Sequence, residues 1–146
     1  MKNGRYEDLV AVRWYRNGLV HRDDGPAVEF HHGDVAWYQN GVMHRDDGPA
    51  LIKANGDKFW IQNEVKHRND GPAFEASSGD KIWYQNDKLH REDGAAIEWS
   101  DGNKEWWLHG NRVSEEEFNQ WLEKKALNKN LQASLHPKLR IKRSKI

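Results

Sequence analysis

The sequence predicts a mainly β protein: a single-layer antiparallel sheet of stacked β-hairpin repeats, solenoid-like in architecture, with a C-terminal capping α-helix. Three observations support this fold class. A 23-residue repeat runs through most of the chain, short apolar segments alternate with Gly-containing turns, and the spacing of apolar residues becomes helical near the end. We therefore divide the chain into a repeat array at 1–113, a helix at 114–127 and a tail at 128–146.

The repeat keeps its period without insertion or deletion. Full copies begin at Trp14, Trp37, Trp60 and Trp83, and a partial copy begins at Trp106. A His and an Asn follow the same step, at His21, His44, His67 and His90 and at Asn17, Asn40, Asn63 and Asn86. A period of this length indicates one supersecondary unit that stacks on its neighbours.

Each copy is long enough for two short strands and their connections. We predict that "PAVEF" is a strand, "HHGD" a turn and "VAWYQ" a second strand. Asn-Gly pairs at 17–18 and 40–41 suit tight turns, whereas the next two copies carry Asn-Glu at 63–64 and Asn-Asp at 86–87. In the first strand one slot is always apolar and the next is mostly charged, which predicts one packed face and one solvated face.

The segment "VSEEEFNQWLEKK" is predicted to be a helix. Ser114 and Glu117 form a capping box, and apolar residues follow at helical spacing. We expect the helix to cover the open end of the last hairpin, as terminal caps of repeat arrays do. Residues 128–146 contain six cations and no acid, and we expect them to form a poorly ordered or partner-ordered basic tail.

Composition restricts the function classes. Apolar residues make up only 36% of the chain, which argues against a deep globular core, while eight Trp, four Tyr and four Phe argue against disorder. The absence of Cys excludes disulfides and thiolate metal sites. Apolar runs are too short for a signal peptide or a bilayer span, so we expect a cytoplasmic protein without membrane insertion.

The repeated "HRDDGPA" supplies the first candidate site. Its His residues could ligate a metal, but equivalent positions two strands apart lie about 10 Å from each other, too far to share one zinc ion. We instead expect each His to hydrogen-bond the backbone or the loop Asp, and we predict no metal site and no cofactor. The carboxylates common to all copies are interpreted as turn residues that accept backbone N–H groups: Asp24, Asp47, Asp70 and Asp93.

The Arg residues beside these His form a row that could bind an anion, a phosphate or an acidic partner. Neutralisation by the neighbouring acids is an equally good interpretation. The candidate binding residues of the loops are His21, Arg22, His44, Arg45, His67, Arg68, His90 and Arg91.

Aromatic and basic residues give two further candidates. The Trp ladder is interpreted as a packing seam between hairpins, with a stacking platform for bases as the alternative. Four residues that lie close in sequence near the C-terminal end of the array could form an aromatic patch for a partner, or the seat of the helix: Trp99, Trp106, Trp107 and His109. The tail could hold an anionic partner through Lys138, Arg140, Lys142, Arg143 and Lys145.

The period, the "WYxNG" turns and the His-containing loops resemble the MORN repeat (membrane occupation and recognition nexus). The nearest type is the divergent MORN-like repeat of bacterial immunity proteins and of phage and large-virus accessory proteins. The resemblance covers residues 14–110, and the usual "HGxG" is here "HRxDGPA". It implies an elongated single-layer sheet that binds something, and it does not imply an enzyme.

Two function hypotheses follow. The first is a non-catalytic interaction module that binds and neutralises or sequesters a partner protein, in counter-defence or toxin immunity, and in the host cytoplasm if the protein is viral. The second is nucleic-acid or nucleotide binding through the Arg row, the aromatic residues and the tail. No Walker loop, nucleophile elbow or HExxH motif occurs, so we expect no enzyme. A second chain could pair with the open edge of the first strand, around residues 8–16, to form an oligomer.

Overall fold

The computed structural model describes the backbone of residues 1–144 and the side chains of residues 1–135. The chain forms two compact units, Met1–Arg112 and Val113–Ile146. The first unit holds the repeats, and the second contains the helix α1 (Glu115–Ser144). No helix in the described part of the chain combines the length and the apolar character needed to cross a membrane.

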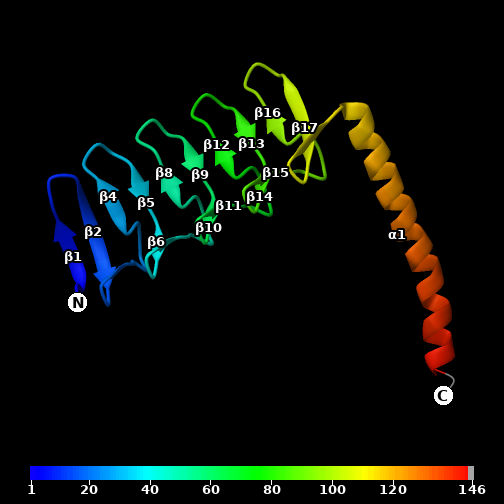
Figure 1. The fold of residues 1–146 in the computed structure, drawn as a ribbon, viewed down its shortest axis with the longest axis horizontal. Helices are drawn as coiled ribbons and strands as arrows, with labels where there is room; N and C mark the ends of the chain where they lie inside the picture. The colour runs from blue at the N-terminus through cyan, green and yellow to red at the C-terminus, as the bar shows by residue number, and fades with distance from the viewer. Residues whose placement is uncertain (145–146) are drawn as a thin grey trace. The chain divides into compact units, whose positions relative to one another are not determined.

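The array consists of short antiparallel strands that stand side by side (Figure 1). Its main sheet contains β1 (Gly4–Glu7), β2 (Ala11–Arg16), β3 (Leu19–Val20), β4 (Val28–Phe30), β5 (Val35–Ala36), β8 (Leu51–Ile52), β9 (Lys58–Phe59), β12 (Phe74–Glu75), β13 (Lys81–Ile82), β16 (Ile97–Glu98), β17 (Lys104–Leu108) and β18 (Asn111–Val113). Separate small hairpins are formed by β6 (Tyr38–Gln39) with β7 (Val42–Met43), β10 (Ile61–Gln62) with β11 (Val65–Lys66), and β14 (Tyr84–Gln85) with β15 (Lys88–Leu89).

The order of strands in the main sheet is β1-β2-β4-β5-β8-β9-β12-β13-β16-β17-β18, and β3 pairs with β2. Each copy therefore adds one antiparallel hairpin to a growing sheet. This order confirms the predicted fold class of stacked hairpins with one C-terminal helix.

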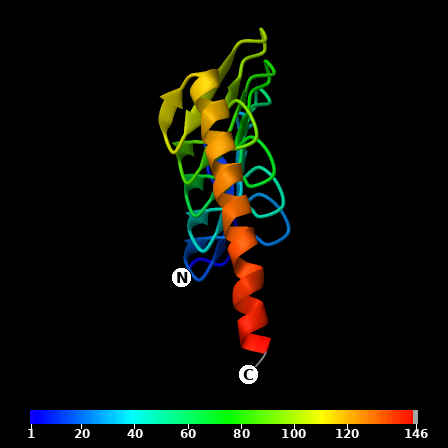
Figure 2. The ribbon, with the colours of Figure 1, turned by 90° about the vertical axis from the view of Figure 1, so that its right-hand side faces the viewer.

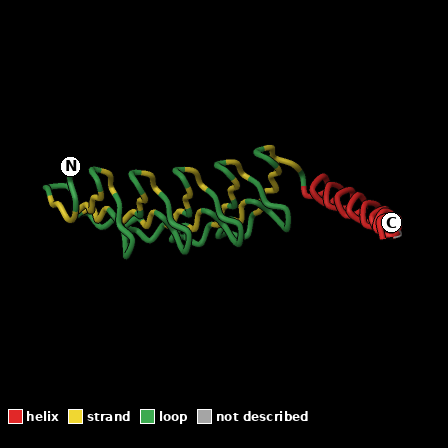
Figure 3. Tube along the Cα trace, turned by 90° about the horizontal axis from the view of Figure 1, so that it is seen from below, coloured by secondary structure: helices red, strands yellow, loops and turns green. Residues whose placement is uncertain are grey.

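The predicted second strand is wrong in one respect in the first three copies, because it divides at the Trp that opens the next copy. In the fourth copy β17 runs through Trp106 without a break. Strand β5 ends before Trp37 and β6 begins after it. The Trp37 N–H donates to the carbonyl of Ala50 at 2.7 Å, and its own carbonyl accepts the N–H of His44 at 3.1 Å. Trp37 is thus a corner at which the chain leaves the main sheet and enters a small hairpin. Figure 3 shows that short strands and loops alternate along the array.

The small hairpins turn at the repeated Asn. Asn40 and Gly41 both have positive φ, at 50° and 81°, as expected for the tight turns that Asn-Gly favours. Copies three and four keep this backbone without Gly, because Glu64 and Asp87 have φ values of 68° and 65°. Side chains with a Cβ are therefore held in a conformation that costs them energy.

The structure confirms that the two faces of the sheet differ. On the packed face Phe74 lies opposite Phe59 and Ile82, and the two Phe ring centroids are 4.7 Å apart. On the other face the neighbouring Glu75 lies opposite Lys58 and Lys81. The core sits between the main sheet and the small hairpins, where Tyr38 and Met43 pack against Ala11, Val28 and Ala36.

The first strand of the sheet corrects another expectation. The segment predicted to have an open edge, around residues 8–16, contains β2, which pairs with β1 on one side and with β4 on the other. At this end the edge of the sheet is therefore β1, which lies upstream of the first repeat.

The helix begins where the capping box predicts. The Ser114 Oγ accepts the N–H of Glu117 at 3.1 Å, and Phe118 is buried. The helix continues to Ser144 (Figure 2), so the expected boundary at residue 127 is wrong. Leu, Lys, Arg, Gln and Ala together supply ten of the 17 residues at 128–144, and these residue types favour helix. That α1 covers the last hairpin stays a prediction.

Candidate interaction site

The four copies of "HRxDG" form what we call the repeat loops: residues 21–25, 44–48, 67–71 and 90–94. Each repeat loop carries the chain from a small strand, such as β7, back to the main sheet, such as β8. All eight loop residues proposed as binding residues lie in these segments, so the structure arranges them as a periodic row.

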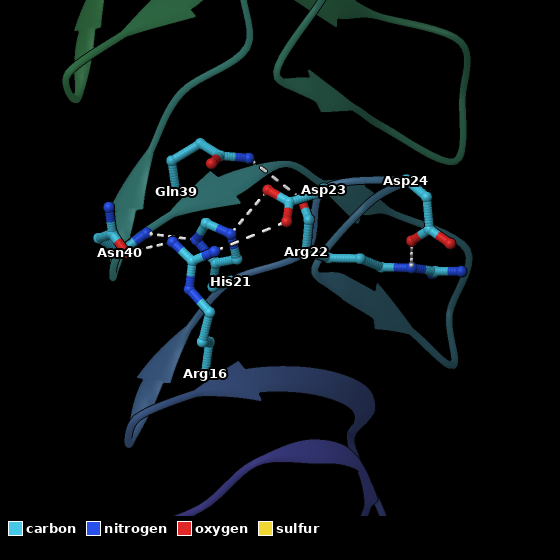
Figure 4. A network of polar contacts seen from close by, with 7 residues as sticks. All are labelled: Arg16, His21, Arg22, Asp23, Asp24, Gln39 and Asn40. Carbon is cyan, nitrogen blue, oxygen red and sulfur yellow. Dashed lines mark hydrogen bonds and ion pairs between the residues drawn. The ribbon is translucent and has the colours of Figure 1, made fainter.

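The His of each repeat loop joins two neighbouring copies. His21 Nδ1 accepts the N–H of Asn40, which belongs to the next copy, at 2.9 Å, and Nε2 lies 2.8 Å from Asp23 Oδ1 (Figure 4). Because Nδ1 accepts, the ring hydrogen lies on Nε2 and is donated to the carboxylate. The same bond to the next copy recurs at 3.0, 3.1 and 2.8 Å in the pairs His44–Asn63, His67–Asn86 and His90–His109. The expected bond to the backbone is confirmed in all four copies, and the expected bond to a loop Asp is confirmed for His21 and His44. In copy three Asn69 takes the place of this Asp.

The Arg of each repeat loop stacks on the Trp that opens its copy. Arg22 Cζ lies 3.8 Å from the centroid of the Trp14 ring. Its Nε donates to Asp24 at 2.9 Å and its Nη1 to the carbonyl of Pro26 at 3.1 Å. The stack recurs at 4.0, 4.0 and 3.8 Å in the pairs Arg45–Trp37, Arg68–Trp60 and Arg91–Trp83. The Trp ladder is therefore part of the scaffold of the loops.

Two further details explain the loop sequence. In copy four Ala95 replaces the repeated Pro, yet its carbonyl still accepts Arg91 Nη1 at 3.0 Å, because the acceptor belongs to the backbone. The loop Gly leaves space for the guanidinium: a Cβ on Gly48 would lie 2.8 Å from Arg45 Cζ. The segment "HRxDGPA" is thus a packing unit built around one Arg.

The exposed charge of the repeat loops is negative. The Arg side chains are only 18–23% exposed, because they lie between Trp rings and carbonyl groups. Their carboxylate partners are 83–88% exposed, at Asp24, Asp47, Asp70 and Asp93. Local neutralisation, one of the two interpretations of the Arg row, is therefore what the contacts support. An external anion would have to compete with these bonds.

Grooves lie between successive repeat loops. One of about 910 Å³ lies between the loops of copies three and four, with Trp83 and Gln85 on its lining together with Asp70 and Asp93. A second, of about 630 Å³, lies between the loops of copies two and three and contains the equivalent residues Trp60 and Gln62. The two grooves are one feature repeated with the period of the array.

A second row of ties lies at the turns of the main-sheet hairpins, and sequence reasoning missed it. Asp34 Oδ1 accepts the N–H of Ala54 in the next copy at 2.7 Å. Asp57 and Asp80 do the same for Ser77 and Ser100, at 2.8 and 2.7 Å. These Asp residues follow the turn Gly at the 23-residue step, so their spacing was a signal that could have identified them.

The hydrogen bonds of this second row change the pKa of each carboxyl group. The Lys53 ammonium, His32 and the Ala54 N–H hold the pKa of Asp34 well below its usual range, and Lys53 has the largest effect. The backbone N–H of Ser77 lowers the pKa of Asp57, and that of Ser100 lowers the pKa of Asp80. At the start of the array, the N–H groups of Ala11 and Val10 lower the pKa of Asp8 to about 2.

The proposed aromatic patch is divided among different surroundings. Trp99 Nε1 donates to Glu105 at 3.0 Å. Trp106 and Trp107 are consecutive residues of β17, so their side chains point to opposite faces of the strand. The His109 ring lies 4.2 Å from that of His90 and occupies the turn position that Asn holds in the other copies. The structure therefore does not gather these four residues into one surface.

The basic residues of the tail belong in part to α1. The helix backbone includes Lys138, Arg140, Lys142 and Arg143, whose side chains lie outside the described residues, and Lys145 lies beyond the described backbone. Among the residues that the structure describes, no group of three or more His, Asp or Glu side chains is placed to hold a metal ion.

Comparisons with protein-family models, with curated proteins and with solved structures found no match for this chain. The functional interpretation therefore depends on the chain's own residues and contacts.

Proposed function

We propose that the protein is a non-catalytic repeat scaffold whose repeat loops bind a basic segment of a partner protein, and that it neutralises or sequesters that partner. The observation that carries this proposal is the periodic groove between repeat loops, with exposed carboxylates on its lining. Carboxylates that already accept one bond from Arg retain further acceptor sites for a cationic side chain.

The period of the grooves matches an extended peptide. Each copy adds two strands to the main sheet, so equivalent points on successive loops are about 10 Å apart. A peptide in the polyproline II conformation advances about 3.1 Å per residue with three residues per turn, so every third side chain lies on one face and would meet a repeat loop. A partner segment with Lys or Arg at every third position would place one cation near each loop carboxylate.

The charge of the loops makes a nucleic acid a weaker candidate for this surface. Nucleic-acid interfaces depend on exposed cations that neutralise phosphates, whereas the loop guanidinium groups are covered and the loop carboxylates are exposed. Binding of nucleic acid or a nucleotide through the Arg row, the aromatic residues and the tail remains the alternative. In that alternative most of the contacts to phosphate would come from the tail residues.

The shifted pKa values support a scaffold in preference to an enzyme. A catalytic acid requires a carboxyl whose pKa is raised, and pairs of catalytic groups require environments that separate their pKa values. The resolved shifts in Asp8, Asp34, Asp57 and Asp80 are all downward and are caused by hydrogen bonds within the scaffold. The MORN-like resemblance forms part of the same proposal, with a role in phage or viral counter-defence or in toxin immunity in the cytoplasm.

The test compares two variants with equal charge. Asp46→Asn, Asp47→Asn and Asp70→Asn together remove three exposed loop charges and keep the side-chain oxygens that accept from His and Arg. The control, Glu115→Gln with Glu116→Gln and Glu123→Gln, removes three exposed charges of α1. Both are used with the wild-type chain to capture partners from lysate and to bind a synthetic peptide with Lys at every third position.

We expect the loop variant to lose most of its binding to the captured protein and to the peptide, and the helix variant to bind like the wild type. An equal loss of binding in both variants would mean that the interaction depends only on the overall charge of the chain. Capture of nucleic acid alone, unaffected by the loop substitutions, would favour the alternative function.

A further inference from the structure

The strand β1 is the terminal strand of the main sheet in the described part of the chain, and it pairs with β2 on one side only. Its four residues are all exposed. Because Gly4 lies opposite Tyr15 and Glu7 opposite Val12, the pairing of the two strands is antiparallel and regular.

The hydrogen-bond pattern shows which groups of β1 point away from β2. In an antiparallel pair, residues that bond to the partner strand alternate with residues whose N–H and C=O point outward. The Asp8 N–H donates to the carbonyl of Ala11, and the Trp14 N–H donates away from β1 to Ala27. By this alternation Gly4 and Tyr6 bond to β2, whereas the N–H and C=O of Arg5 and Glu7 point outward.

The outward groups of β1 are self-complementary. An antiparallel copy of β1 placed about a two-fold axis at Tyr6 brings Arg5 opposite Glu7 of the second copy, and Glu7 opposite Arg5. Each of these two pairs joins the outward N–H and C=O groups of both residues, and each sets opposite charges face to face. The two Tyr6 rings, each 42% exposed, meet on the other face of the sheet.

Other registers are disfavoured by charge. Moving the second strand by two residues in either direction keeps the hydrogen-bonding polarity but sets Arg5 opposite Arg5, or Glu7 opposite Glu7. Like charges directly opposite each other destabilise a strand pair.

We propose that β1 is a dimerisation edge, at which a second copy of this chain pairs antiparallel about Tyr6 and continues the main sheet. This inference goes beyond the proposed function of the repeat loops and does not depend on it.

The experiment measures the molar mass of the full-length chain by sedimentation equilibrium over concentrations up to the millimolar range. Arg5→Glu alone and Glu7→Arg alone each create two like-charge pairs in the dimer, whereas the double variant restores two opposite-charge pairs. Since two cross-strand pairs change in each single variant, we expect its dimer dissociation constant to rise by about tenfold or more and to recover in the double variant.

A backbone variant tests the same edge independently of charge. Glu7→Pro removes an outward N–H and leaves the bonds between β1 and β2 in place, so we expect loss of the dimer with little change in the circular dichroism spectrum. A wild-type chain that is monomeric at every concentration would overturn the proposal. A dimer whose dissociation constant in both single charge variants equals that of the wild type would also overturn it, whether or not the proline variant folds.

Discussion

Neighbouring copies of the array are tied together along two rows that use different chemistry. On the side of the repeat loops the acceptor is a neutral ring nitrogen, such as His44 Nδ1 for the Asn63 N–H. At the turns of the main sheet it is a carboxylate, such as Asp57 Oδ1 for the Ser77 N–H. Most strands of the main sheet contain two residues, so backbone pairing alone is short in each hairpin. One tie on each side holds the next copy in register.

The difference between the two rows follows from what surrounds them. The His row lies in loops that already contain an Arg stacked on a Trp and an exposed carboxylate, so a neutral acceptor adds no further charge. The Asp row lies at the turns of the main-sheet hairpins, where a charged acceptor gives a stronger bond to a backbone N–H.

The largest effect is expected for the Arg of a repeat loop. Arg45→Ala removes the stack on Trp37, the bond to Asp47 and the bond to the Pro49 carbonyl. We expect the free energy of unfolding to fall by about 2–4 kcal/mol, measured by urea denaturation. Asp47→Asn is the control, because its side-chain oxygen can still accept from Arg45, and a loss in the control as large as in Arg45→Ala would contradict the central role of the Arg.

A smaller loss is expected for the His row. His44→Ala leaves the Asn63 N–H without its partner and should lower the free energy of unfolding by about 1–3 kcal/mol. Asp46→Asn should change it by less than about 0.5 kcal/mol. Copy three supports this control, since Asn69 Oδ1 already lies 3.0 Å from His67 Nε2. Equal effects of the two substitutions would show that the tie depends on the carboxylate as much as on the ring.

The repeat made the fold predictable from sequence, and the parts that were missed are those in which one residue has two roles. The uninterrupted period identified the stacked hairpins, and the bonding of His21 followed from its place beside Asp23.

The corner at Trp37 was missed because "VAWYQ" has the composition of a continuous strand, although the N–H and the C=O of Trp37 bond to different neighbours. The role of Asp34 was missed because an Asp after a turn Gly has an adequate local explanation. The burial of Arg22 depends on the Trp14 stack, which adjacent letters in the sequence do not show.

A stabilising substitution is expected at the small hairpins. Glu64 has a φ of 68°, where Gly41 of the preceding copy has 81°. Glu64→Gly should therefore raise the free energy of unfolding by about 0.5–1 kcal/mol, the relief of strain being partly offset by the greater entropy of Gly in the unfolded chain. The reverse substitution, Gly41→Glu, should lower it by a similar amount. If Glu64→Gly destabilises the chain, a contact of the Glu side chain must outweigh the backbone strain.

The smallest effect is expected from titration of the Asp row, and its direction follows from the lowered pKa values. A carboxyl whose pKa is lower in the folded than in the unfolded chain contributes stability above its unfolded pKa and loses it as the pH falls through the folded value. The Ser77 N–H lowers the pKa of Asp57 below 3.8, so this contribution is complete at neutral pH and decreases once the pH falls below about 4. Asp57→Asn keeps an oxygen for the Ser77 N–H but does not titrate, so urea denaturation between neutral pH and pH 2 should show a shallower acid decline than the wild type.

His44→Ala, which affects only the other row, should leave the Asp57 contribution to that decline in place. A decline that is equally steep with and without Asp57 would mean that the carboxylate tie contributes no pH-dependent stability, and that the two rows differ in chemistry without differing in their response to acid.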